Sequence, residues 1–249
     1  MTKQGEKNKM ETELLNEGIR KQELNLIFVI DSSGSMEGEK IGAVNNAIRD
    51  VISIMPDIQE DTSDAKIKIS ALTFSDTCNW VYNEPKDVDE FKWTDISTSG
   101  ATNYSAVYDE LAKFLCKKEN GGSMPDIGGV APIIIFMSDG MPTSLDWKEH
   151  LASLKKKGWF KVALKYALAI QIDTNEAMDI LSSFTGNPET VLRVYTAEAL
   201  RKVIKVIAVS ASKAKSSSSQ IDNGSIVSKD EMAKQEIAAE LEEISDVEW

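Results

Sequence analysis

The sequence predicts an α/β protein with a doubly wound, mostly parallel central sheet, helices on both of its faces and one antiparallel edge strand. From residue 24 onward, apolar segments alternate with segments whose apolar residues recur at helical spacing. Two apolar segments, residues 24–30 and 132–137, are nearly continuous, as in parallel strands covered on both faces. Residues 66–74 alternate as a strand, and residues 78–82 follow after the short turn SDT, which favours an antiparallel pair.

A helix is expected after the first strand. Residues 40–55 place six apolar side chains at helical spacing: Ile41, Val44, Ile48, Val51, Ile52 and Met55. Pro56 is expected to end this helix, because proline has no amide hydrogen to donate and its ring crowds the preceding turn. The strand over residues 66–74 comes next, so the helix connects two strands of one sheet.

The second half of the chain repeats this alternation. Residues 105–118 are predicted to form a helix, and the loop ENGGSMPDIGG separates it from strand 132–137, the most apolar strand of the chain. Further helices are expected over residues 147–157, 176–184 and 197–212, and further strands over residues 162–170 and 191–194. Strands that alternate with helices in this way form a largely parallel sheet.

Composition divides the chain into a charged extension over residues 1–23, one domain over residues 24–212, a polar linker over residues 213–228 and a C-terminal segment over residues 229–249. The linker contains the run KAKSSSSQIDNGS, which has little apolar surface to bury. One helical stripe of the last segment is apolar and consists of Ala233, Ile237, Leu241 and Ile244. This amphipathic helix either docks on its own domain or serves as a tethered recognition helix for a partner.

Charge and composition argue against several classes of function. The 40 acidic and 28 basic residues give a formal net charge of −12, which disfavours nucleic-acid binding through phosphate neutralisation. The chain has no run of about 20 apolar residues to cross a membrane, and its charged N-terminus lacks the apolar centre of a signal peptide. Cys78 and Cys116 form no disulfide framework, although the sequence leaves open whether they pair. We therefore expect a cytoplasmic protein that binds neither nucleic acid nor membrane.

Carboxylates and hydroxyls follow the predicted strands at three points. Asp31 ends the first strand and begins the motif DSSGS, and Asp139 lies in SDGMPT after strand 132–137. The segment STSGATNYS, which contains Thr102, leads into the helix expected from residue 105. Because the carboxyl ends of parallel strands meet at one edge of a sheet, we expect these three loops to lie together. Ser and Asp are also common helix caps, but capping alone does not explain three such loops.

These oxygens predict a site for a divalent cation. If Asp31 and Asp139 lay about 5 Å apart, their repulsion would cost about 3 kcal/mol at an effective dielectric constant of about 20. A divalent cation removes that cost, and carboxylate and hydroxyl ligands suit a hard ion. We therefore expect Mg²⁺ or Mn²⁺ as the cofactor.

Five residues resemble the metal-ion-dependent adhesion site of von Willebrand factor A domains: Asp31, Ser33, Ser35, Thr102 and Asp139. The resemblance covers residues 24–212 and implies the Rossmann-like fold of that family. It implies that the three hydroxyls ligate the metal directly and that the two aspartates act through bridging water. One position would stay open for an Asp or Glu of a protein partner. The residues expected to contact that partner are Gly34, Met36, Asn103, Gly140 and Thr143.

Within this family, the chain looks most like the stand-alone bacterial TerY-like proteins, which occur with tellurite-resistance and related stress systems. The stretches that carry this likeness are GEKIGAVNNAI, ALTFS and FTGNPETVLRVYTAEALRKVIKVIAVSAS. The likeness implies a protein-binding module of a stress-response assembly, and from the residues of the site we expect no enzymatic activity. The N-terminal extension, the loop at residues 120–130 and the tail beyond residue 212 depart from the pattern.

Other classes of function share some of these features. A scaffold or regulator would use the same surface without metal, and the presence of ligand residues does not distinguish it. A phosphoryl-transfer enzyme of the haloacid-dehalogenase type also has an aspartate after its first strand, but Ser33 stands where its second aspartate is expected. A serine hydrolase needs a base, and the single histidine, His150, lies on a predicted helix away from the strand ends. We therefore expect no catalytic residue and no small-molecule substrate.

Overall fold

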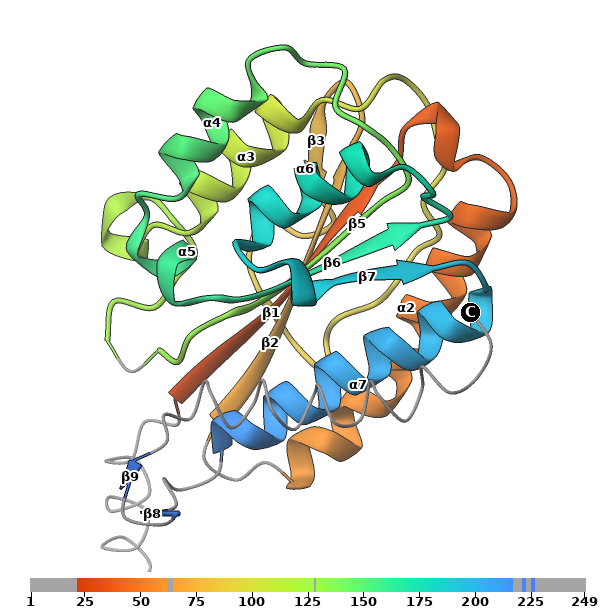
Figure 1. Ribbon diagram of the computed structural model, residues 1–249. Helices are drawn as coiled ribbons and strands as arrows, with labels where there is room; N and C mark the ends of the chain where they lie inside the picture. The colour runs from red at the N-terminus through yellow and green to blue at the C-terminus, as the bar shows by residue number, and fades with distance from the viewer. Residues whose placement is uncertain (1–21, 62–64, 128, 217–220, 223–224, 227–249) are drawn as a thin grey trace, which may run out of the picture.

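A seven-stranded sheet forms the centre of the protein in the computed structural model (Figure 1), which describes residues 22–61, 65–127, 129–216, 221–222 and 225–226. The strands are β1 (Gln22–Asp31), β2 (Ala65–Phe74), β3 (Cys78–Trp80), β4 (Lys86–Asp87), β5 (Ile133–Ser138), β6 (Leu164–Ile170), β7 (Val191–Val194), β8 (Ile221–Asp222) and β9 (Ser225–Ile226). The α-helices are α2 (Glu39–Asp61), α3 (Tyr104–Phe114), α4 (Trp147–Leu154), α5 (Gly158–Val162), α6 (Asn175–Thr185) and α7 (Ala197–Ser216). Short 3₁₀ helices are η1 (Gly34–Met36), η2 (Lys118–Asn120) and η3 (Pro188–Thr190).

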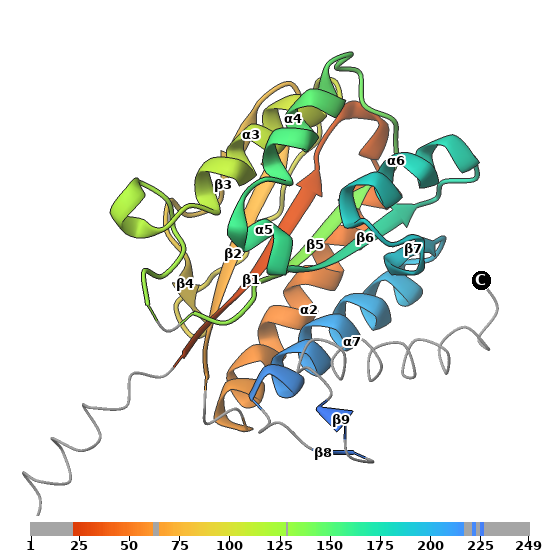
Figure 2. The same cartoon turned by 60° about the vertical axis from the view of Figure 1, so that its left-hand side comes forward.

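The sheet reverses its strand order beside β1. Its strands lie in the order β3-β2-β1-β5-β6-β7, and β4 also pairs with β2. β1 pairs in parallel with β2 on one side and with β5 on the other, and the parallel series continues through β6 and β7. β3 is an antiparallel edge strand. The predicted fold class is therefore confirmed, and the reversal lies between β1 and β5, whose carboxyl ends share one edge of the sheet (Figure 2).

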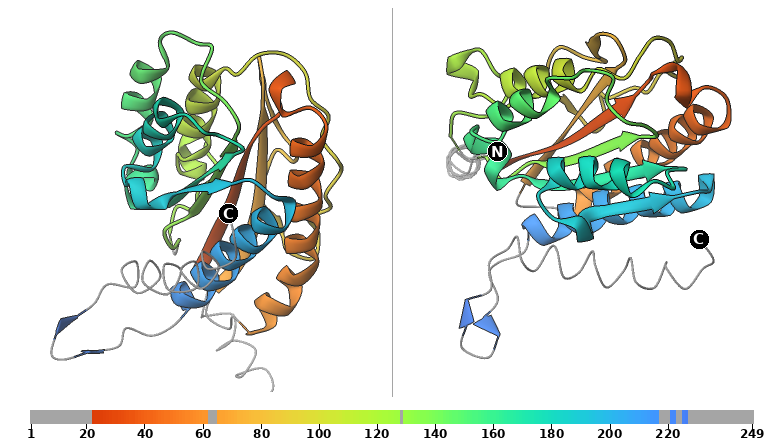
Figure 3. Two further views of the ribbon diagram at one scale, coloured as in Figure 1. Left: turned by 45° about the vertical axis from the view of Figure 1, so that its right-hand side comes forward. Right: turned by 45° about the horizontal axis from the view of Figure 1, so that its top comes forward.

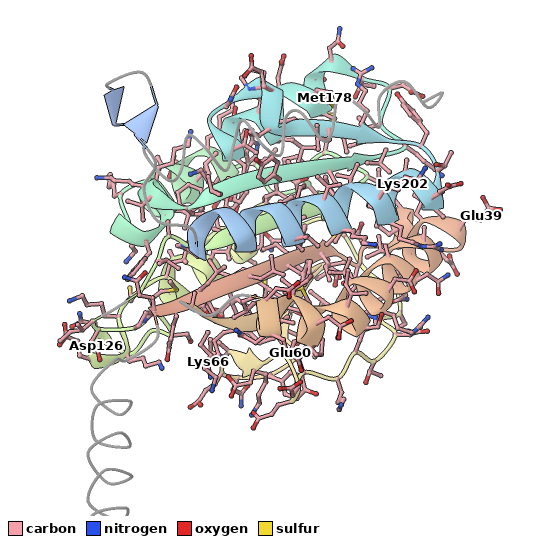
Figure 4. All side chains as sticks on the ribbon, turned by 90° about the horizontal axis from the view of Figure 1, so that it is seen from below. Glu39, Glu60, Lys66, Asp126, Met178 and Lys202 are labelled. Carbon is pink, nitrogen blue, oxygen red and sulfur yellow. The ribbon has the colours of Figure 1, made fainter. Side chains whose placement is uncertain are left out.

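Helices cover both faces of the sheet, because successive side chains of a strand point to opposite faces. On β1, Phe28 belongs to the core beneath α2 and α7, whereas Val29 belongs to the core beneath α3, α4, α5 and α6. The left view of Figure 3 separates these two layers. In Figure 4, α2 and α7 run side by side across one face, and Glu39 and Glu60 mark the two ends of α2. Each large apolar side chain that these cores bury fully contributes about 1.5–3 kcal/mol.

Helix α2 continues through Pro56, so the prediction that Pro56 ends this helix is wrong. Proline in a helix interior costs about 3 kcal/mol, because it removes one hydrogen bond and crowds the preceding turn. Tertiary contacts offset this cost. Ile58 is buried in the core, and the side-chain amide of Gln59 donates to the carbonyl O of Ala65 at 2.9 Å and accepts from the amide N of Ile67 at 2.6 Å. These contacts join the last turns of α2 to β2.

Several short elements differ from those expected. Strand β4 was not predicted, and its Asp87 forms ion pairs with Lys66 and Lys68 of β2. Helix α5 was not predicted either, and it delays the start of β6 to Leu164. Helix α3 ends at Phe114, four residues before its expected end.

Ordered elements also extend into the segment expected to be a polar linker. Helix α7 reaches Ser216, and β8 and β9 pair as an antiparallel hairpin. The C-terminal amphipathic helix over residues 229–249 and nearly all of the extension over residues 1–23 lie outside the described residues. Within the part of the chain that the structure describes, no helix combines the length and apolar character needed to cross a membrane.

Candidate metal centre

The predicted metal-site residues lie at the edge of the sheet where the strand order reverses. Asp31 is the last residue of β1, and Asp139 directly follows β5. Ser35 lies in η1, one residue after the loop that contains Ser33. Thr102 lies in the loop that leads into α3. Three segments far apart in the sequence therefore converge on one edge of the sheet, as the motif spacing predicts.

Asp31 is fully buried beneath this edge. Its carboxylate accepts hydrogen bonds from the amide N of Ser33 at 2.8 Å and from Ser138 Oγ at 2.6 Å. Burial raises the pKa of Asp31, the hydrogen bonds from Ser138 and Ser33 oppose that shift, and repulsion from Asp139 adds to it. Asp31 therefore fixes the loop that carries the serines instead of facing solvent.

The serine hydroxyls form a connected row with Asp139. Ser33 Oγ lies 3.1 Å from Ser35 Oγ, and Ser35 Oγ donates to Asp139 Oδ1 at 2.7 Å. Mg²⁺ binds its octahedral ligands at about 2.0–2.1 Å, so two adjacent ligands lie about 3.0 Å apart. The spacing of the two hydroxyls therefore fits adjacent positions around such an ion, and the oxygen-only donor set fits its chemistry.

The loop that contains Thr102 is hydrogen-bonded to both neighbouring loops. The amide N of Gly34 donates to the carbonyl O of Gly100 at 3.0 Å, and the amide N of Thr143 donates to the carbonyl O of Thr102 at 2.8 Å. Gly100 adopts φ +77, and a Cβ there would lie 2.1 Å from Asp76 Oδ2, so this turn requires glycine. Thr102 is 5% exposed, and its hydroxyl has no hydrogen bond to any described residue.

Two buried residues, Ser138 and Tyr104, form hydrogen bonds beneath the site. Ser138, the first residue of the segment SDGMPT, donates to Asp31, and Tyr104 lies next to Ser138. The Tyr104 hydroxyl lies 3.0 Å from Ser138 Oγ and 3.1 Å from the carbonyl O of Gly140, and Tyr104 is completely buried. Its position at the start of α3 gives no sequence signal for this contact, which arises only when α3 packs against β5.

Lys40 also reaches the site, although it was not predicted to belong to it. Its ammonium Nζ lies 2.5 Å from Asp139 Oδ2 and 3.2 Å from the carbonyl O of Ser35. Lys40 is near Asp31 in the sequence, in GEKIG, but the contact depends on how the start of α2 approaches the end of β5. Charge and spacing alone do not reveal it.

The residues predicted to contact a partner differ in their exposure. Gly34 and Thr143 are exposed, and Asn103 and Gly140 are partly exposed. Met36 is completely buried in the core beside α2, so its prediction as a partner contact is wrong. Its side chain points inward because η1 packs against the start of α2.

Two exposed apolar side chains beside the site were missed. Met141 is 41% exposed and Leu145 is 100% exposed, and both lie in the loop that follows Asp139. Single exposed apolar side chains are common on protein surfaces, so these two define no binding surface by themselves and only add apolar area to the loop. The signal in the sequence was the run GMPTSL, which places apolar residues in a loop after a buried strand.

The described part of the chain contains no second candidate metal site built from His, Cys, Asp or Glu side chains. No group of three or more His, Cys, Asp or Glu residues there could hold a metal ion. Cys78 and Cys116 are both free thiols. His150 links α4 to α3 through Asp109, at 2.7 Å, and also contacts Asp146. The candidate centre therefore consists of three hydroxyls and only two carboxylates.

A comparison with protein families identifies the class. Residues 25–208, which include most of β1, the other six strands of the central sheet and all five candidate ligands, match the model of the von Willebrand factor type A domain. The chain belongs to this family, whose domains often serve as adhesion or protein-binding modules.

Solved structures share this fold at low sequence identity. The pilus adhesin SpaC from Lactobacillus rhamnosus GG, in its open conformation, is 13% identical with a TM-score of 0.59, and the match covers 78% of this chain and 30% of that chain. The ArnB paralog VWA2 from Sulfolobus acidocaldarius is 21% identical with a TM-score of 0.52, over 74% of this chain and 44% of that chain. The vWF domain of the type V pili tip protein Mfa5 from Porphyromonas gingivalis is 8% identical with a TM-score of 0.56, over 82% of this chain and 99% of that chain.

These likenesses show the fold alone. The chain spans less than half of the SpaC and VWA2 chains that it matches. A search of curated proteins finds no match.

Proposed function

We propose that this protein is a metal-dependent protein-binding module that takes an Asp or Glu side chain of a partner at the candidate metal centre. The observation that supports it most is the row formed by Ser33 Oγ, Ser35 Oγ and Asp139, in which the hydroxyls lie 3.1 Å apart at the reversal of the strand order. Mg²⁺ or Mn²⁺ is the proposed cofactor, because the donors are oxygens and the spacing fits an octahedral ion.

The residues of the site have separate roles in this proposal. The hydroxyls of Ser33, Ser35 and Thr102 are the direct ligands. Asp31 holds the amide of Ser33 in place, and Asp139 orients the hydroxyl of Ser35, as second-layer carboxylates do in metal sites. When bound, the cation supplies positive charge and a coordination position that accepts a carboxylate.

The surface around the site suggests the kind of partner that it fits. Gly34 and Thr143 leave the centre accessible, and Met141 and Leu145 supply apolar contact area on one side. An acidic residue flanked by apolar side chains would match both features, because apolar contact adds affinity and the carboxylate gives specificity. The net charge of −12 opposes an acidic partner at long range, but salt screens that repulsion beyond about 8–10 Å.

We also propose a cellular setting from the sequence likeness alone. The three stretches that resemble TerY-like proteins support a role in a bacterial stress-response assembly of the tellurite-resistance type. A cytoplasmic location is proposed on the same basis, together with the low cysteine content.

A metal-independent scaffold is the second candidate function. The contact between Lys40 and Asp139 favours it, because this ion pair satisfies one carboxylate of the site without any metal. The same surface loops would then recognise a partner directly.

Partner binding should depend on the cation. Immobilised wild-type protein is expected to retain a partner in Mg²⁺ and to release it in EDTA, and Asp31→Ala protein should not retain it. Thr185→Ala serves as a control, because Thr185 is as buried as Thr102 but lies at the end of α6. A partner retained equally in EDTA and by Asp31→Ala protein would favour the metal-independent scaffold.

We propose that the protein has no hydrolase activity. The Ser33 and Ser35 hydroxyls contact each other and Asp139, and no described histidine lies with them, since His150 contacts Asp109 and Asp146 instead. Neither hydroxyl therefore has the histidine base of a serine hydrolase, and the Asp139 carboxylate that accepts from Ser35 also accepts from Lys40. Hydrolysis of p-nitrophenyl phosphate with Mg²⁺ should equal that of Asp31→Asn protein. Metal-dependent turnover that disappears in Asp31→Asn would restore the enzyme hypothesis.

A further inference from the structure

Lys40, a residue of this same chain, forms an ion pair with the carboxylate of Asp139. Its ammonium Nζ contacts Asp139 Oδ2 at 2.5 Å and the carbonyl O of Ser35 at 3.2 Å. The other carboxylate oxygen, Oδ1, accepts from Ser35 Oγ at 2.7 Å. The side chain of Asp139 is 1% exposed and that of Lys40 is 24% exposed, so the contact is largely shielded from water.

This contact changes the electrostatics of the metal centre. Asp31 and Asp139 bring two formal negative charges, and Lys40 offsets one of them. A shielded carboxylate without a partner is strongly unfavourable, so Lys40 stabilises Asp139 as long as no metal is present. The same positive charge repels a divalent cation that approaches Asp139, and the low dielectric of a shielded site strengthens that repulsion.

We propose that Lys40 is an internal counter-cation of the metal centre, which holds Asp139 in the metal-free protein and competes with the divalent cation for that carboxylate. This inference rests on the proposed function, because it concerns the affinity of the proposed metal site. Its consequence is that the cation binds more weakly than the donor set alone would allow. A partner carboxylate would then strengthen metal binding, because its negative charge offsets the positive charge of Lys40.

A cavity beside Lys40 gives its side chain room to leave Asp139. The cavity has a volume of ≈ 530 Å³ and lies between the start of α2, the carboxyl ends of β6 and β7 and the start of α7. Lys40 and Glu39 both line it, together with Ala43 and Ile170. Glu39 marks this end of α2 in Figure 4. The cavity therefore offers space beside Glu39 for the Lys40 side chain when it leaves Asp139.

Calorimetric titration with Mn²⁺ tests the competition. Lys40→Gln protein is expected to bind Mn²⁺ about tenfold more tightly than the wild type, because a nearby positive charge is removed. Without metal, its melting temperature should fall by about 3–8 °C, because Asp139 loses its charged partner and keeps only the hydrogen bond from Ser35. Saturating Mn²⁺ should raise the melting temperature of Lys40→Gln protein by more than that of the wild type.

Lys68→Gln is the matched control. Lys68 is 19% exposed, forms an ion pair with Asp87 and lies near the opposite end of β2 from the site, so its replacement removes the same charge elsewhere. It should leave the Mn²⁺ affinity unchanged. In an Asp139→Asn background, Lys40→Gln should no longer lower the melting temperature of the metal-free protein.

The outcomes separate this inference from the proposed function. Equal or weaker Mn²⁺ binding by Lys40→Gln protein overturns the role of Lys40 and leaves the metal centre intact. Absence of Mn²⁺ binding in both proteins overturns the metal centre and, with it, the competition. Tighter binding by Lys40→Gln but not by Lys68→Gln supports the inference.

Discussion

Phe136→Ala is expected to lower the free energy of unfolding by about 3–5 kcal/mol, the usual cost of truncating a buried phenylalanine. Phe136 lies on β5 and is completely buried. Its ring centroid lies 4.8 Å from that of Phe184, 5.3 Å from that of Phe74 and 5.3 Å from that of Tyr104. Removing the ring therefore leaves a cavity that aromatic neighbours from three other elements cannot easily fill.

The effect should also reach the metal centre, because Tyr104 contacts both Ser138 and Gly140. Chemical denaturation monitored by circular dichroism measures the loss of stability. Phe136→Leu should lose much less, since most of the volume is retained. Leu145→Ala, at a fully exposed position, should change stability by no more than about 0.5 kcal/mol. A loss below about 1 kcal/mol for Phe136→Ala would show that this cluster does not form the core beneath the site.

The central strands could be predicted because their sequences are apolar at nearly every position. The apolar runs at residues 24–30 and 132–137 coincide closely with β1 and β5, which pair in parallel from Leu26↔Ile133 to Ile30↔Met137. Strands covered on both faces need apolar side chains at nearly every position, and that requirement leaves a clear signal.

Elements that depend on tertiary contacts could not be predicted. The continuation of α2 past Pro56 depends on the contacts of Gln59 with β2, and no local sequence pattern predicts these contacts. Strand β4 has two residues, and its ion pairs with Lys66 and Lys68 join positions about 20 residues apart. Local preference is a weak guide where such long-range contacts decide the outcome.

Some features of the candidate site could likewise be predicted from the sequence, and others depend on tertiary contacts. The convergence of the loops of Asp31, Thr102 and Asp139 follows from topology, because all three lie at the edge where β1 and β5 end. The contact of Lys40 with Asp139 required the folded positions of α2 and β5, so the sequence did not reveal it. Met36 was predicted to contact a partner because it directly follows the motif DSSGS. Its side chain points into the core instead.

Thr102→Ala is expected to weaken Mn²⁺ binding by about 100-fold or more. Thr102 is proposed as one of three direct hydroxyl ligands, and the loss of even an indirect supporting group commonly costs 10–100-fold in affinity. The fold should tolerate the change, because the loop is held by backbone bonds from Gly34 to Gly100 and from Thr143 to Thr102 that remain in the variant. Thr185→Ala, at a threonine of similar burial, should bind Mn²⁺ like the wild type.

Isothermal titration calorimetry of the wild type and these two variants with Mn²⁺ tests the metal centre most directly. We expect one saturable ion per wild-type chain, the same for Thr185→Ala, and binding about 100-fold weaker or absent for Thr102→Ala. A wild type that binds no Mn²⁺, or a Thr102→Ala protein that binds it as tightly as the wild type, would show that these residues do not form the proposed metal centre.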